Sequence, residues 1–233
     1  MVLIGIGLSD CSKIRKTEAE KQREEWIESF SDSISYYQNQ AKALETSLDE
    51  LHGRIEAILP EFEKTENPRE VAGVYIMKGW KEKLPMLSSG IYARINEREG
   101  LEIIATLGGA TFNQIGVGEG SEEILSDVVR HDQAFNYRHE RYNTVCFSGE
   151  KADSVAAFIA DNYREKINLK FIEGEKKRNF NIPENEKNMI RQTWLLYSNQ
   201  TEAKKLEKEL WIASKKIETF RRIMEMQNEK PEN

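Results

Sequence analysis

The sequence predicts an α+β protein in which two long helices form an antiparallel coiled-coil hairpin, with a small antiparallel β domain containing one helix inserted between them. Apolar residues near both ends recur at helical spacing, whereas those in the middle alternate with a period of two. Charged residues make up 32% of the 233 residues, which suits exposed helices because each needs only one apolar stripe. The predicted boundaries are 12–67 for the first helix, 68–182 for the β domain and 183–228 for the second helix. Residues 1–11 precede them as a signal-like segment and 229–233 follow as a tail.

The first long helix is predicted from about Thr17 to Leu59. Its apolar residues recur at alternating steps of three and four, the spacing that places a seam along one side of a helix. The seam positions are Ile27, Phe30, Ile34, Tyr37, Ala41, Leu44, Leu48, Leu51, Ile55, Ile58 and Phe62. Gly53 weakens this helix, and Pro60 ends or kinks it because proline lacks an amide donor. The stretch Thr65–Pro68 is predicted to be a linker.

The second long helix is predicted to begin near Pro183, with Glu184 and Glu186 in a first turn that favours negative charge. Its seam consists of Ala203, Leu206, Leu210, Ala213, Ile217, Phe220 and Met224. A wider apolar face precedes the seam, at Met189, Ile190, Trp194, Leu195 and Tyr197. Each seam needs a partner, and the simplest solution is that the two pair with each other. Pairing between two chains is the alternative, which would make a homodimer through the helices.

The middle of the chain changes to the strand period. Alternation over Ile91–Ile95 and over Leu101–Leu107, around Glu99-Gly100, predicts a β-hairpin. Further strands are predicted at Gln114–Val117, Phe135–Tyr137, Tyr142–Phe147 and Ile167–Phe171, with one helix at Val155–Tyr163. The glycines between 108 and 120 match no nucleotide-binding fingerprint and predict turns and a bulge. Lys176, Lys177 and Arg178 are predicted to lie in a turn with Gly174.

The apolar run from Val2 to Leu8 ends directly before Cys11 and is followed by a charged, helix-forming sequence. Leu8-Ser9-Asp10-Cys11 resembles the lipobox of uncharacterised bacterial lipoproteins with a coiled-coil stem. The resemblance implies that Cys11 is lipidated and that the protein faces the periplasm from a membrane. The alternative is an apolar strand or helix start with a buried thiol.

The net charge of −6 disfavours non-specific binding to nucleic acid, which requires an excess of Lys and Arg. The two cysteines, Cys11 and Cys146, cannot form a disulfide framework, and no CxxC pair indicates zinc. No apolar stretch reaches the roughly 20 residues that cross a bilayer. We therefore predict no cofactor and no metal.

Residues 131–140 hold the densest group of chemically capable side chains. His131 and His139 with a carboxylate could bind a metal, and Cys146 could pair with either histidine in a thiol enzyme. On an extended segment, however, the histidines lie about 25 Å apart. If Val145 and Phe147 point inward, Cys146 points outward. A polar turn region is the favoured interpretation.

The residues proposed from the sequence as a partner or ligand surface are Tyr75, Trp80, His131, Tyr137 and His139. The favoured function is a non-enzymatic envelope binding or scaffold protein that presents its β domain on a helical stalk to a protein partner. An enzyme with its site near His131, His139 and Cys146 is one alternative. The other is a cytoplasmic chaperone hairpin that resembles prefoldin in its helix–β–helix order.

Overall fold

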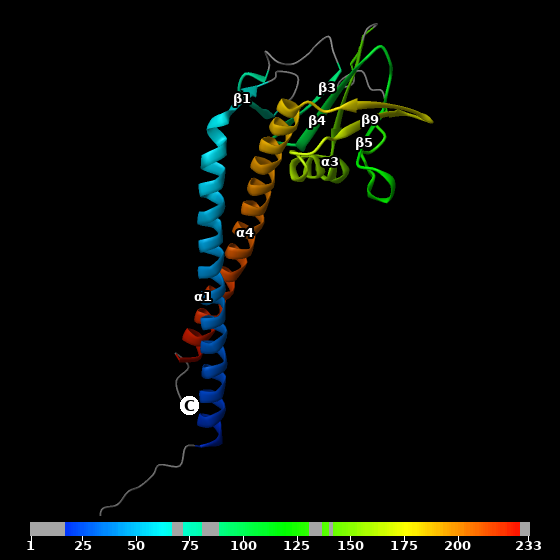
Figure 1. Cartoon of the computed structure of the whole chain (residues 1–233). Helices are drawn as coiled ribbons and strands as arrows, with labels where there is room; N and C mark the ends of the chain where they lie inside the picture. Colours follow the sequence, from blue (N-terminus) through cyan, green and yellow to red (C-terminus); the bar gives the residue numbers. More distant parts are fainter. Residues whose placement is uncertain (1–16, 67–71, 81–88, 131–136, 140–141, 229–233) are drawn as a thin grey trace, which may run out of the picture. The chain divides into compact units, whose positions relative to one another are not determined.

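The computed structural model describes residues 17–66, 72–80, 89–130, 137–139 and 142–228. It is an α+β structure with two long helices and antiparallel sheets, as the sequence predicts (Figure 1). The chain divides into two compact units. The first unit combines residues up to Ser47 with those from Leu206 onward, and the second runs from Leu48 to Lys205.

Helix α1 spans Glu18–Ile58, close to its predicted limits. A capping box starts it: the Thr17 hydroxyl accepts from the Glu20 amide at 3.3 Å, and the Glu20 carboxylate accepts from the Thr17 amide at 2.5 Å. The helix gives way to the 3₁₀ turn η1, Leu59–Glu61, which contains Pro60. Helix α4 spans Glu184–Asn228 and begins directly after Pro183, as predicted.

The first unit consists of the outer parts of α1 and α4, which lie side by side (Figure 1). Within it, the predicted seam residues are half-buried or buried, while most of the positions between them are exposed. The Phe220 ring lies 5.4 Å from the Phe30 ring and 5.9 Å from the Tyr37 ring, between centroids. Lys216 Nζ is 3.0 Å from the Tyr37 hydroxyl. At Phe220, a residue of the second predicted seam therefore contacts two residues of the first.

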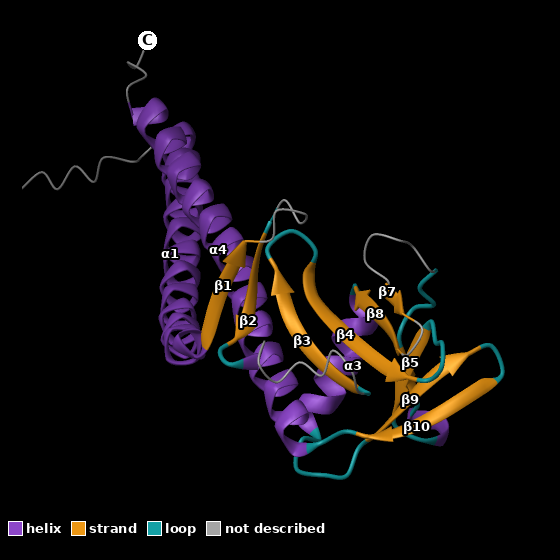
Figure 2. Cartoon of the chain, turned by 90° about the horizontal axis from the view of Figure 1, so that it is seen from above, coloured by secondary structure: helices purple, strands orange, loops and turns teal. Residues whose placement is uncertain are grey.

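The second unit contains two antiparallel sheets and helix α3, Glu150–Asp161 (Figure 2). The six-stranded sheet has the order β1 (Phe62–Glu66), β2 (Gly73–Met77), β3 (Gly90–Asn96), β4 (Gly100–Gly108), β8 (Tyr142–Ser148) and β7 (Tyr137–His139). The four-stranded sheet has the order β10 (Lys176–Asn181), β9 (Asn168–Glu173), β5 (Gln114–Val117) and β6 (Ile124–Leu125), and the 3₁₀ turn η2 spans Gly120–Glu122. The predicted β3–β4 hairpin is confirmed, with Ala93 opposite Ile103.

Two strands, β1 and β10, contradict the sequence predictions. The stretch from Thr65 is not wholly a linker, because Thr65 and Glu66 belong to β1 and pair with β2. Phe62 is likewise the first residue of β1 and not the last of the helical seam; its buried ring packs with Ile95 and Leu196. The three basic residues 176–178 form β10 and not a turn, because β9 supplies the ladder partners.

The core of the second unit lies between one face of the six-stranded sheet, helix α3, the start of α4 and the four-stranded sheet. Helix α3 contributes residues at helical spacing: Ala152, Val155, Ala156, Ile159 and Ala160. Val145 and Phe147 of β8 point into this core, while Cys146 between them is half-buried. Phe112, Phe147 and Phe171 are fully buried, and the Phe112 and Phe171 rings meet edge to face at 4.7 Å.

Candidate functional site

Three of the sequence-predicted site residues lie along one edge of the six-stranded sheet. In the β7–β8 pair, Tyr137 lies opposite Thr144 and His139 lies opposite Tyr142. Cys146 lies four residues beyond Tyr142 on β8, a backbone separation of about 13 Å. That separation is too long for a thiol–imidazole pair between Cys146 and His139.

The other predicted residues do not join this edge. Cys11 and His131 lie outside the described residues. Tyr75 lies on β2, near the opposite edge of the same sheet, where its hydroxyl donates to Glu97 at 3.3 Å. Trp80 is buried in the core beside Tyr92, with 5% of its surface exposed, so the structure gives it a packing role.

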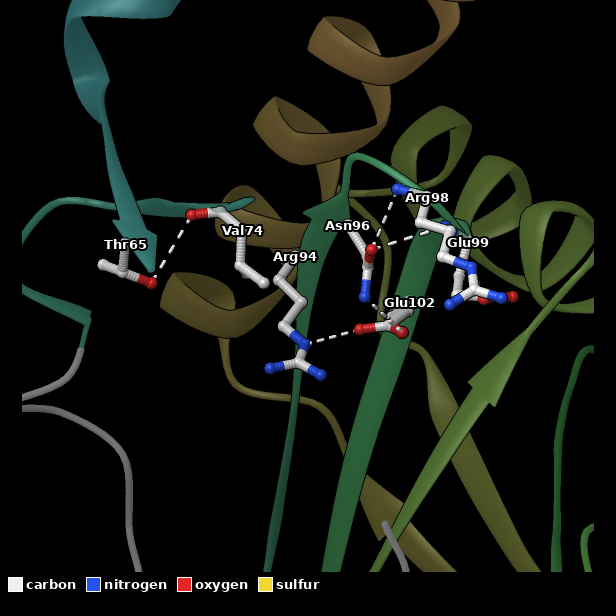
Figure 3. A network of polar contacts seen from close by, with 7 residues as sticks. All are labelled: Thr65, Val74, Arg94, Asn96, Arg98, Glu99 and Glu102. Atoms are coloured by element: carbon white, nitrogen blue, oxygen red, sulfur yellow. Dashed lines mark hydrogen bonds and ion pairs between the residues drawn. The ribbon is translucent and has the colours of Figure 1, made fainter. Parts of the chain in front are cut away.

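The β3–β4 hairpin carries a polar network that the sequence analysis did not identify (Figure 3). Arg94 Nε donates to the Glu102 carboxylate at 2.6 Å, and Asn96 Nδ2 donates to its other oxygen at 3.3 Å. Asn96 Oδ1 accepts from the amides of Arg98 and Glu99, at 3.0 and 3.3 Å. The network therefore joins the hairpin turn to a buried ion pair across the strands.

This network holds the hairpin in register. The turn between Asn96 and Gly100 needs a positive φ at Gly100, which is +87° there. Arg94 and Glu102 are direct cross-strand partners, and both side chains are largely buried. The predicted turn position was enough to place these two residues opposite each other, so the sequence did contain the signal for the pair.

A second polar arrangement lies at the edge of the four-stranded sheet. Lys170 Nζ is 2.6 Å from Glu123 Oε1 and donates to the Gly118 carbonyl at 2.9 Å. The hydrogen bond from Lys170 is the largest effect that lowers the pKa of Glu123. Lys170 thus holds both ends of the loop that contains η2. This loop borders an open cleft of about 250 Å³ at the carboxyl end of α3, which Phe158, Asn162 and Lys166 also line.

Two acidic side chains on helices of the second unit are sheltered from solvent: Asp153 is half-buried and Glu186 is buried. Burial raises the pKa of Asp153 on α3, although its carboxylate accepts from the Tyr197 hydroxyl at 3.3 Å. Burial raises the pKa of Glu186 in the first turn of α4 to about 7, while the Ile91 amide donates to this carboxyl at 2.9 Å. The hydrogen bond to Asp153 joins α3 to α4, and the hydrogen bond to Glu186 joins the start of α4 to β3.

Among the described residues, no group of histidine, cysteine and acidic side chains could hold a metal ion. No helix in that part of the chain has an apolar stretch long enough to cross a membrane. Comparisons of the chain with protein-family models, with curated proteins and with solved structures found no match.

Proposed function

We propose that the protein is a non-enzymatic binding or scaffold protein of the bacterial cell envelope, anchored by lipid on Cys11 and facing the periplasm. In this proposal an antiparallel coiled-coil hairpin serves as a stalk, and the β domain contacts a protein partner. The observation that carries the proposal is the burial pattern of the two long helices. Within the first unit their seam residues are buried or half-buried, while most of the other positions are exposed.

The ring contacts support pairing within one chain. Phe220 lies between the rings of Phe30 and Tyr37, so it is level with Ile34. Counting along both helices at 1.5 Å per residue then places Leu44 level with Leu210. Leu44 is half-buried, as Leu210 is. This is the register expected for an antiparallel pair, in which each seam residue fits between residues of the other helix.

The chemistry of the β domain supports binding over catalysis. Glu102 pairs with Arg94 across the hairpin, and Glu123 pairs with Lys170 at the edge of the other sheet. In both cases the charged groups stabilise a turn or a loop. The backbone separation of Cys146 from His139 weakens the thiol-enzyme alternative, because a nucleophile and its base must come within hydrogen-bond reach.

Growth with a labelled fatty acid tests the anchor. Native protein and a Cys146→Ala variant should both carry the label, while Cys11→Ala should lose it. Cys146→Ala is the matched control because it removes the other cysteine of the chain. Equal labelling of all three proteins, or of none, would contradict the anchor.

Crosslinking in the native envelope tests the binding role. A scaffold should capture the same protein from wild-type cells and from cells that carry His131→Ala with His139→Ala. Loss of an enzymatic activity in that double variant, with capture unchanged, would instead support the enzyme alternative.

A further inference from the structure

The two sides of the helical pair in the first unit differ in chemistry. In the heptad repeat, written abcdefg, Ile27, Ile34 and Ala41 occupy position a of α1. Position e comes directly after each d residue and lies on one side of the seam. Position g comes directly before each a residue and lies on the other side. A groove of about 920 Å³ is lined by Gln38 and Ser214, which are e positions of α1 and α4. The e positions of both helices therefore share one side, and the g positions share the opposite side.

Charge is concentrated on the side that contains this groove. Across residues 21–47 and 207–226, nine of the 14 residues at positions b and e are charged, against two of the 14 at positions c and g. The two exceptions are Glu209, near the end of the unit, and Lys216, whose ammonium group turns back onto the Tyr37 ring at 4.6 Å. The c and g positions thus make a weakly charged face, although coiled coils usually place charges beside the seam.

Large apolar side chains occupy this weakly charged face, which we call the apolar face. Its apolar residues are Trp26, Tyr36, Ala43, Ile212, Ile223 and Met226. Tyr36, Ile212 and Met226 are exposed to 64%, 39% and 51% of their surface, respectively. Exposed apolar residues that gather along one face of a helical pair usually mark a contact with another protein.

The outermost column of each helix suggests what covers the apolar face. Position f of α1 carries Glu18, Glu25 and Asp32, and position f of α4 carries Lys208, Lys215 and Arg222; all six are exposed. In the first unit, the f column of α1 contains no basic residue and that of α4 contains no acidic one. In the register given above, a second hairpin that sets its α4 beside this α1 would bring Asp32 level with Arg222 on each edge, while Lys208 and Lys215 lie level with the uncharged Thr46 and Asn39.

We propose that a second copy of this chain covers the apolar face, so that two hairpins form a four-helix bundle with a twofold axis along the helices. The inference rests on the hairpin proposed above. The twofold axis keeps each residue at its level, so Asp32 lies beside the partner's Arg222 and Ala43 beside the partner's Ile212. Every neighbouring pair of helices is then antiparallel.

The size of the face predicts a moderate affinity. The shared length of about 20 residues is roughly 30 Å, and two helices are together about 20 Å wide. Each copy would bury about 600 Å², which gives about 1,200 Å² in total, at the lower end of specific interfaces. The dimer should therefore dissociate on dilution.

Sedimentation velocity on the full chain tests the proposal, with Cys11→Ala in every protein so that lipid does not drive association. The parent should be a dimer that dissociates on dilution, and Tyr36→Glu with Ile212→Glu should sediment as a monomer with unchanged helix content. Trp211→Glu is the matched control, because Trp211 is 62% exposed but lies on the charged side. It should leave the dimer intact.

A charge reversal tests the orientation of the two copies. Asp32→Arg should weaken the dimer about tenfold, since two exposed pairs change from attraction to repulsion, and adding Arg222→Asp should restore it. A parent that is monomeric throughout, or a Trp211→Glu variant that dissociates as readily as the apolar-face variant, would overturn the dimer. Loss of helix content in the apolar-face variant would instead count against the hairpin on which the inference rests.

Discussion

Replacement of Glu186 by glutamine should make the second unit more stable at alkaline pH. Glu186 lies in the first turn of α4 with 7% of its surface exposed, and its carboxyl accepts the Ile91 amide at 2.9 Å. Burial is the largest effect on this carboxyl and raises its pKa from 4.5 to about 7. Glutamine keeps the shape and the acceptor oxygen but carries no charge.

The sign and the size of the effect follow from the two pKa values. Between pH 4.5 and about 7, the folded protein binds a proton that the unfolded chain has already released. Stability therefore falls as pH rises through this window, and the full cost is present above pH 7. At about 1.4 kcal/mol per pH unit the difference is roughly 3 kcal/mol, and partial access of solvent reduces it to about 2 kcal/mol.

Urea unfolding followed by tryptophan fluorescence at pH 5 and pH 8 measures this effect. Glu186→Gln should match the wild type within about 1 kcal/mol at pH 5 and exceed it by about 2 kcal/mol at pH 8. Glu184→Gln removes the same charge from an exposed position in the same turn and should leave the pH dependence unchanged. If wild type and Glu186→Gln lose stability in parallel from pH 5 to pH 8, the buried ionisation of Glu186 is refuted.

Three further changes test local features of the second unit. Gly53→Ala should stabilise α1 by about 0.5 to 1 kcal/mol, because no atom lies within 4 Å of the added methyl group. Gly118→Ala should destabilise by about 2 kcal/mol, because φ is +79° there and the methyl group meets the Glu122 carbonyl. Equal midpoints for these two variants in thermal melting would contradict both arguments. Arg94→Met should cost about 3 kcal/mol in urea unfolding, because it removes the ion pair that Arg94 makes with the buried Glu102 carboxylate. Adding Glu102→Leu should recover most of that loss, and a double variant no more stable than the single one would contradict this reasoning.

The helices and the central hairpin could be predicted because their signals are local. The alternating spacing from Ile27 to Ile58 fixes which side of α1 is least exposed, whatever covers it. Alternation of apolar residues likewise predicted β3 and β4, since the alternating residues Ala93, Ile103 and Ala105 are fully buried in the core. In both cases the sequence period equals the structural period.

Strands β5, β8 and β9 were also predicted, whereas β1, β2, β6 and β10 were not, because their stability comes from partners in the sheet. Strand β10 begins with basic residues and is mostly exposed, so its sequence has no alternation of apolar and polar residues. Its pairing with β9 holds it as a strand. Exposed basic residues on an edge strand also discourage pairing with other chains. The burial of Glu186 depends on strand β3, about 95 residues earlier in the chain, so no pattern around Glu186 indicates it.

The positions of the candidate surface residues in space could not be predicted, because closeness in sequence does not decide which side chains enter the core. Tyr75 and Trp80 are close in sequence, but Tyr75 bonds to Glu97 at the sheet edge while Trp80 enters the core. Tyr137 and His139 lie along one strand, β7, although the predicted strand ended at Tyr137. The apolar face of the helical pair could be identified only from the contacts between seam residues, because spacing alone does not say which helix pairs with which.

The central claim is that α1 and α4 of the same chain pair through their seams. Cysteines at Gln38 and Ser214, which line the same groove, should be joined by a bis-maleimide that spans about 8 to 10 Å, the separation of packed helices. The background carries Cys11→Ala and Cys146→Ala, and Gln38→Cys with Lys215→Cys is the control because Lys215 lies on the outer side of α4. Mass spectrometry on a mixture of isotopically light and heavy chains should find the Gln38–Ser214 link only within chains of one isotope, with little link in the control. Links that join light to heavy chains in statistical proportion would contradict the hairpin.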